Sequence, residues 1–112
     1  MQTPLRITMR DLPPSEAIEG HVRQHAAKLD KLCNRLTACH VTIETPHRHK
    51  THGKHYHVRI DLAVPGEELV VGRERSDSRV HEDAYAAVDA AFEGAERVLR
   101  DHVSRQRTSR RV

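Results

Sequence analysis

The spacing of apolar residues changes period several times along these 112 residues, and these changes constrain the fold more than any other feature. In three segments apolar and polar residues alternate, which is the two-residue period of a half-buried strand, and a fourth short strand is expected around Leu69 and Val71. In two longer segments apolar residues recur at every third or fourth position, which is the period of an amphipathic helix. The pattern therefore predicts strands near 5–10, 40–44, 56–64 and 69–71, and helices over 15–36 and from about 80 to 104.

The order of these segments predicts an α+β fold with the element order β-α-β-β-β-α. The helix between the first two strands makes a right-handed crossover, so these two strands should be parallel. The later connections between strands are short enough for antiparallel hairpins. Because each element has one apolar face, we expect a two-layer sandwich in which both helices cover one face of a four-stranded sheet.

The length of the chain indicates one domain. We predict a single folded domain over residues 1–104, followed by a basic and flexible tail over 105–112, where the composition becomes polar and rich in arginine. Ser15 is expected to cap the first helix, because its hydroxyl can accept a hydrogen bond from an unpaired N–H group of the first turn.

The composition excludes several classes of function. Aromatic residues make up 3% of the chain and tryptophan is absent, so a base-stacking RNA platform is not expected. No apolar run reaches membrane-spanning length and no leader is recognisable, so we expect a cytoplasmic protein without a membrane partner. Glycine-rich phosphate loops and nucleophile elbows are absent, so we expect no enzyme, no cofactor and no small-molecule substrate.

Two kinds of residue that often carry chemistry are expected to be structural. Cys33 and Cys39 are six residues apart and do not form a C-x-x-C pair, so we expect reduced, buried thiols. Tyr85 lies at the flank of the apolar face of the last helix, and we expect it to pack into the core with its hydroxyl at the rim.

Positive charge is concentrated towards the C-terminal end. The formal net charge of the chain is +3, whereas the segment from Arg97 onward carries six arginines and one acid, Asp101. At about 100° per residue, a basic stripe that begins at His21 follows the first helix, and arginines of the last helix fall together opposite its apolar face. Neighbouring helices of this kind would form one cationic ridge, a surface that suits phosphate backbones. The expected RNA-binding residues are His25, Lys28, Lys31, Arg35, Arg97, Arg100 and Arg107.

The same charges could also form a solvated helix face. Glu93 and Glu96 each lie four residues before an arginine, Arg97 and Arg100 respectively, which is the favourable orientation for a helical ion pair. For the arginines beyond residue 104 we favour contact with nucleic acid or with an acidic protein, since charge adds little stability to a helix end.

A histidine-rich loop between the second and third strands allows three interpretations. It could face RNA, because His, Arg and Lys all donate hydrogen bonds to phosphate. It could bind zinc, copper or nickel, although no acid or cysteine accompanies the histidines and the interleaved cations would repel a metal. It could also be a plain solvent-exposed hairpin loop. The possible RNA-binding residues are Arg48, Lys50, Lys54 and His57, and the possible metal ligands are His47, His49, His52, His55 and His57.

Several segments together resemble a known family. The sequences DAYAAVD at 83–89 and ERVLR at 96–100 resemble the closing helix of the ribosome hibernation promoting factor and ribosome-associated translation inhibitor family. KLDKL at 28–32 is similar to the end of that family's first helix, and VPGEEL at 64–69 is similar to its hairpin. The resemblance extends from about residue 5 to residue 102.

The resemblance implies a bacterial, cytoplasmic and non-enzymatic protein of the short form. Members of the family bind the small ribosomal subunit where messenger and transfer RNA bind, and silence translation under stress or in stationary phase. Their basic residues on both helices touch ribosomal RNA, which by position implies Lys28, Lys31, Arg97 and Arg100. Gly94 and His25 stand where the family usually has lysine. Two other functions remain open, a metal-binding module and a regulator that binds an acidic protein.

Overall fold

The computed structural model describes residues 3–45, 56–72 and 83–110, the last four of them as backbone only. The elements occur in the predicted order β-α-β-β-β-α. Their bounds are β1 Leu5–Arg10, α1 Glu16–Leu32, β2 Ala38–Glu44, β3 His57–Val64, β4 Glu67–Val71 and α2 Ala84–Arg110.

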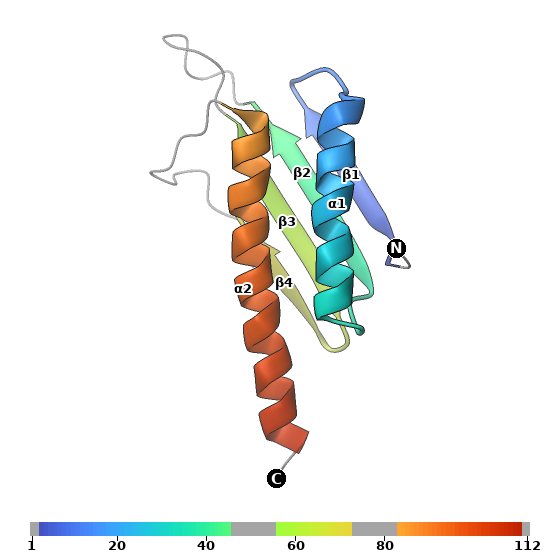
Figure 1. Cartoon of the computed structure of the whole chain (residues 1–112), viewed down its shortest axis with the longest axis vertical. Helices are drawn as coiled ribbons and strands as arrows, with labels where there is room; N and C mark the ends of the chain where they lie inside the picture. The colour runs from blue at the N-terminus through green and yellow to red at the C-terminus, as the bar shows by residue number, and fades with distance from the viewer. Residues whose placement is uncertain (1–2, 46–55, 73–82, 111–112) are drawn as a thin grey trace.

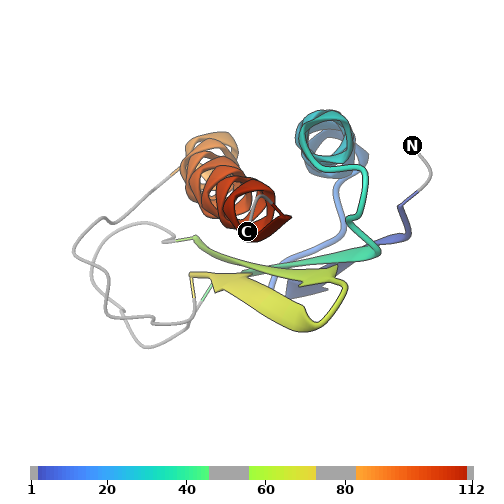
Figure 2. The ribbon, with the colours of Figure 1, turned by 90° about the horizontal axis from the view of Figure 1, so that it is seen from below.

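The four strands form one mixed sheet in the order β1-β2-β3-β4. Strand β1 pairs with β2 in parallel, with Ile7 opposite Val41, whereas β2–β3 and β3–β4 are antiparallel. Both helices lie side by side on one face of this sheet (Figures 1 and 2). The predicted two-layer architecture is therefore confirmed, including the parallel pair that the α1 crossover requires.

The core lies between the sheet and the helix pair. Each strand contributes its inward-facing alternate residues, and each helix contributes the apolar stripe predicted from its period. Burial of each large side chain contributes about 1.5–3 kcal/mol, so this layer is the main source of stability. The largest fully buried side chains are those of Phe92, Leu29, Ile43, Ile60, Leu62, Leu99, Val22, Val41 and Val88.

Helix α1 begins as predicted and ends earlier than predicted. Ser15 is the N-cap, and its hydroxyl accepts a hydrogen bond from the Ile18 N–H at 3.3 Å. The helix ends at Leu32 rather than near residue 36, because Cys33 has extended backbone angles of φ −140° and ψ 106°. The turn that follows leads into β2, so Arg35 does not lie on the helix where the sequence placed it.

Helix α2 begins at Ala84, and Asp83 caps it. The Asp83 carboxylate accepts a hydrogen bond from the Tyr85 N–H at 2.9 Å, while its carbonyl accepts one from the Ala87 N–H at 3.0 Å. The predicted start near residue 80 lies outside the described residues.

The last helix is also longer than predicted. It continues to Arg110, past Ser104 where we expected fraying, and its end extends beyond the sheet (Figure 1). Its last turns contain no glycine or proline, and Arg and Gln are good helix formers. The division into a domain over 1–104 and a flexible tail over 105–112 stays a prediction.

Strand β4 is held close to β3 at its far end by a glycine. Gly72 has φ +78°, and a Cβ atom at this position would lie 2.3 Å from the Val58 carbonyl oxygen. Only glycine fits both the backbone angle and the space. Within the parts of the chain that the structure describes, no helix has the length and apolar character needed to cross a membrane.

Candidate nucleic-acid interface on the helix pair

The surface that the two helices turn away from the sheet, here called the helix face, carries four exposed cations. Lys28 and Lys31 come from α1, and Arg97 and Arg100 come from α2. The two helices contact each other and cover the same face of the sheet (Figure 2). These four predicted residues are exposed on the two neighbouring helices, and their contact with RNA stays a prediction.

None of these four cations has an ion pair or hydrogen bond with another described residue. In particular, the helical pairs Glu93–Arg97 and Glu96–Arg100, which the sequence allowed, do not form in the described structure. Exposed pairs of this kind contribute only about 0.3–0.5 kcal/mol, so their absence costs the fold little. The cationic groups are thus available to an external anion.

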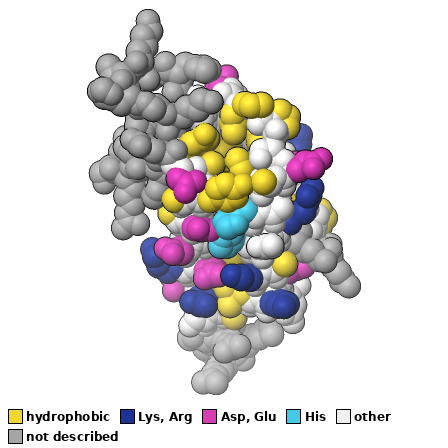
Figure 3. Space-filling view, turned by 45° about the horizontal axis from the view of Figure 1, so that its top comes forward, with side chains coloured by type: hydrophobic (Ala, Val, Ile, Leu, Met, Phe, Trp, Pro, Cys, Tyr) yellow, Lys and Arg dark blue, Asp and Glu magenta, His cyan; other side chains and the backbone are white. Residues whose placement is uncertain are grey.

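The helix face is not uniformly positive. Figure 3 shows Lys and Arg side chains interleaved with Asp and Glu, and a patch of histidine at the centre of the view. The acids of α2 interrupt the continuous ridge that the sequence suggested. The surface therefore carries separate cations between acidic residues. This arrangement favours individual phosphate contacts over a broad positive potential.

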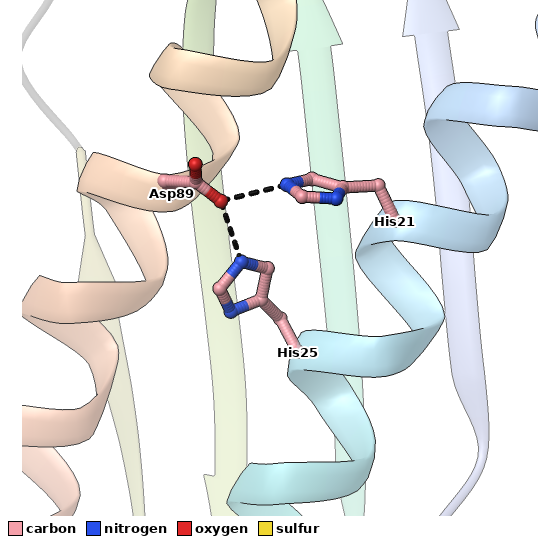
Figure 4. A group of neighbouring side chains, drawn as sticks. All are labelled: His21, His25 and Asp89. Carbon is pink, nitrogen blue, oxygen red and sulfur yellow. Dashed lines mark hydrogen bonds and ion pairs between the residues drawn. The ribbon is translucent and has the colours of Figure 1, made fainter.

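The histidines of the basic stripe contact an acid of the other helix (Figure 4). His21 and His25, one turn apart on α1, both direct Nε2 at Asp89 Oδ1 on α2, at 2.6 Å and 2.7 Å. The side chains are 27%, 18% and 50% exposed respectively, so the group lies at the surface seam between the helices. These two hydrogen bonds, first that of His25 and then that of His21, hold the pKa of Asp89 below its usual value.

Aromatic contacts fix the histidine rings. His25 stacks on Phe92 with ring centroids 4.9 Å apart and planes at 10°, while His21 meets His25 and Tyr85 edge-on at 5.0 Å and 5.2 Å. Tyr85 is 40% exposed and covers the edge of His21, so the prediction that it packs into the core is wrong. His25 is thereby held by Asp89 and Phe92, and its contact with RNA stays a prediction.

Sequence reasoning placed His21 and His25 in the stripe but missed Asp89 as their partner. The two histidines at i and i+4 gave a signal, because this spacing puts both on one helix face. The position of Asp89 opposite them depends on how far α2 is displaced along α1, which no local pattern specifies.

The remaining predicted cations lie elsewhere. Arg35 borders a hollow between the ends of the two helices, together with His102 and Gln106. Arg107 belongs to α2, and its side chain is not described. Arg105, for which the sequence suggested no folding partner, lies 4.0 Å from Glu67 on β4, which also accepts a hydrogen bond from His102 at 2.7 Å.

His57 lies on the outer face of the sheet, opposite the helices. Its Nε2 contacts the carbonyl of Gly72 at 2.9 Å, and it lines a shallow hollow on this face with Arg6, Arg10 and Arg59. Arg59 is paired with Asp61 at 3.0 Å, and this hydrogen bond raises its pKa. The structure therefore does not bring His57 together with the cations of the helix face. The loop residues Arg48, Lys50 and Lys54, with His47, His49, His52 and His55, lie outside the described residues.

Taken together, the fold and this surface define a class: a small α+β domain whose mixed sheet carries two parallel helices, with exposed cations that have no ion pair among the described residues. A sequence model of one family, described as sigma 54 modulation protein / S30EA ribosomal protein, matches residues 5–107. The chain belongs to this family, which confirms the resemblance drawn from its helix and hairpin segments.

Two solved structures have a similar fold. A ribosomal subunit interface protein from Coxiella burnetii has a TM-score of 0.72 and 14% identity, over 91% of this chain and 99% of that one. The N-terminal domain of Protein Y from Thermus thermophilus has a TM-score of 0.66 and 22% identity, over 90% of this chain and 99% of that one. No curated protein matches the sequence of this chain.

Proposed function

We propose that this chain is a non-enzymatic, cytoplasmic protein that binds ribosomal RNA of the small subunit through its helix face. Bound there, it blocks the sites of messenger and transfer RNA and silences translation under stress or in stationary phase. Membership of a ribosome-associated family supports the partner. The observation that supports this surface is a set of four exposed cations on two adjacent helices, none of which pairs with an acid in the described part of the chain: Lys28, Lys31, Arg97 and Arg100.

Phosphate is the chemical group that this set fits best. Arginine can bind a phosphate with two parallel hydrogen bonds, and lysine supplies a mobile point charge. Contacts of this kind position a protein on RNA largely without reading sequence. Each also releases condensed counterions, so affinity for ribosomes should fall steeply as salt rises.

Charge reversal on α2 tests the surface directly. We expect Arg97→Glu with Arg100→Glu to reduce co-sedimentation with ribosomes at moderate salt at least tenfold, because two attractive contacts become repulsive. Circular dichroism and urea unfolding should stay unchanged, since both side chains are exposed. Undiminished co-sedimentation would falsify the assignment of the helix face.

A matched control uses the outer face of the sheet. Arg6→Glu with Arg10→Glu makes the same change in charge on exposed residues of β1. We expect this variant to bind ribosomes within about threefold of the original chain, apart from the general effect of net charge. Equal losses in both variants would show that only net charge matters.

Inhibition is tested separately from binding. Purified chain added at a small excess over ribosomes should suppress protein synthesis in a reconstituted translation system, and the α2 variant should not. A pull-down from lysate distinguishes the ribosome from an acidic protein partner, because nuclease treatment removes the former and spares the latter.

A further inference from the structure

We propose that His21, His25 and Asp89 form a binding site for one divalent transition metal ion of the zinc type, which joins α1 to α2. The site lies at the seam between the helices in Figure 4. It is independent of the histidine-rich loop, and it does not rest on the proposed function.

The geometry of the three side chains suits a metal ion. Their ligand atoms all lie within 4.8 Å of one another. In a tetrahedral zinc site with bonds of about 2.0–2.2 Å, ligand atoms stand about 3.3–3.5 Å apart. The Nε2 atoms of His21 and His25 now lie 2.6 Å and 2.7 Å from Asp89 Oδ1, so each separation must grow by less than about 1 Å. Rotation of the half-exposed Asp89 side chain can supply this movement.

The surrounding residues hold the two rings ready. The stacking of His25 on Phe92 and the edge contacts of His21 with Tyr85 and His25 restrict both rings. Histidines at i and i+4 of a helix present Nε2 on one side, as in helical zinc motifs. Metal binding requires each imidazole to be neutral with its proton on Nδ1, which frees the Nε2 lone pair. The ion thus replaces two hydrogen bonds by three coordinate bonds.

The donor set indicates which metals fit. Two imidazole nitrogens with one carboxylate oxygen suit Zn²⁺, Ni²⁺, Cu²⁺ and Co²⁺, whereas Mg²⁺ and Ca²⁺ prefer all-oxygen sites. One carboxylate leaves a dication with a net charge of +1, and the next acid along α2, Glu93, is nearby in sequence. The partial exposure of the three side chains leaves a fourth position open to water. Lys28, three residues after His25, is the nearest cation on the same side of α1 as the two histidines, and its charge opposes the ion.

A hydrogen-bonded clamp without metal is the competing explanation of the same geometry. The two explanations differ in what happens when zinc is added. A metal that binds only the folded chain stabilises it, and at a free concentration of 100 times Kd it raises the ratio of folded to unfolded protein about 100-fold. A clamp alone gives no such change.

The experiment must first remove the histidines of the loop, since they could bind metal on their own. The background variant therefore carries His47→Gln, His49→Gln, His52→Gln and His55→Gln in the full-length chain. Isothermal titration of this variant with Zn²⁺ should give one site with a Kd in the micromolar range or tighter. Co²⁺ should produce visible absorption bands of a nitrogen- and oxygen-ligated site.

Three further substitutions in this background assign the ligands. His21→Asn, at the more exposed histidine, and His25→Asn should each weaken Zn²⁺ binding at least tenfold and abolish the Co²⁺ bands. Asp89→Asn keeps a side-chain oxygen of the same shape but removes the charge, so it should also weaken binding at least tenfold. Far-ultraviolet circular dichroism confirms that each variant is folded.

Either of two results overturns the metal site: the background variant without the loop histidines binds no zinc at about 100 µM metal, or its zinc binding is unchanged by His21→Asn and by Asp89→Asn. Ribosomes are absent from these measurements. Failure here therefore leaves the proposed RNA-binding surface untouched, and failure of ribosome binding leaves the metal site untouched.

Discussion

Basic residues at the two ends of the helix pair have opposite roles. Towards the start of both helices, His21 and His25 turn into the seam and contact Asp89. Further along, Lys28 and Arg100 stay exposed and make no ion pair within the described part of the chain. What differs is the partner that α2 places opposite α1. A stripe of basic residues is therefore not one surface: its first turns hold the helices together, and its later turns are available to a ligand.

The largest effect should follow from replacing the two exposed lysines of α1, Lys28 and Lys31. We expect Lys28→Ala with Lys31→Ala to weaken ribosome binding about 10- to 100-fold at moderate salt, because two phosphate contacts are lost. The slope of log affinity against log salt should become shallower by about two. Sedimentation at several salt concentrations measures both quantities. An unchanged slope would mean that these lysines meet no phosphate.

At the seam, we expect a substitution to lower stability and to leave ribosome binding almost unchanged. Asp89→Ala, measured with a chelator present, should lower the free energy of unfolding by about 1 kcal/mol, since two hydrogen bonds at a half-exposed acid are lost. Ribosome affinity should stay within about threefold. Glu93→Ala, one turn along α2, is the control and should change stability by less than about 0.5 kcal/mol. Urea titrations compare the three proteins.

Two helix glycines extend the same contrast to packing. A Cβ atom at Gly20 of α1 meets nothing within 4 Å, whereas at Gly94 of α2 it would lie 3.0 Å from Val71 Cγ1. Gly20→Ala should therefore stabilise the protein by about 0.5–1 kcal/mol through helix propensity. At Gly94 the crowding of Val71 should offset this gain, and the change should be close to zero. Equal stabilisation by both substitutions would show that Val71 moves aside freely.

The smallest effect is expected for the reactivity of Cys39, which lies in the core beneath the two helices. Burial, with smaller contributions from Asp30 and Asp61, raises the pKa of Cys39 to about 11. At pH 8 only about one thiol in a thousand is then the reactive thiolate. We expect no iodoacetamide labelling of Cys39 in the folded chain or in the lysine and Asp89 variants, by mass spectrometry. Rapid labelling of the Asp89 variant would show that the seam controls opening of the core.

Periodicity predicted the elements and their order, because the choice between strand and helix is written in local spacing. It was less accurate where the chain changes direction. The first helix was extended over Arg35, since Cys33 and Leu36 continue the apolar pattern although α1 ends at Leu32. Both residues are buried, but they lie in the connection between α1 and β2 and not on a helix. A pattern of burial does not distinguish these from another helical turn.

The sequence predicted which residues belong to the candidate site better than it predicted which of them contact each other. The sequence alone determined that Lys28, Lys31, Arg97 and Arg100 would lie on solvent-facing sides of two helices, because the apolar stripe fixes the opposite face. Only the tertiary structure decided that Asp89 would meet His21 and His25, that Glu67 would approach Arg105, and that His57 would face away from the helices. Helical spacing is a property of neighbours along the chain, whereas the relative displacement of α1 and α2 is set by how their side chains pack on the sheet.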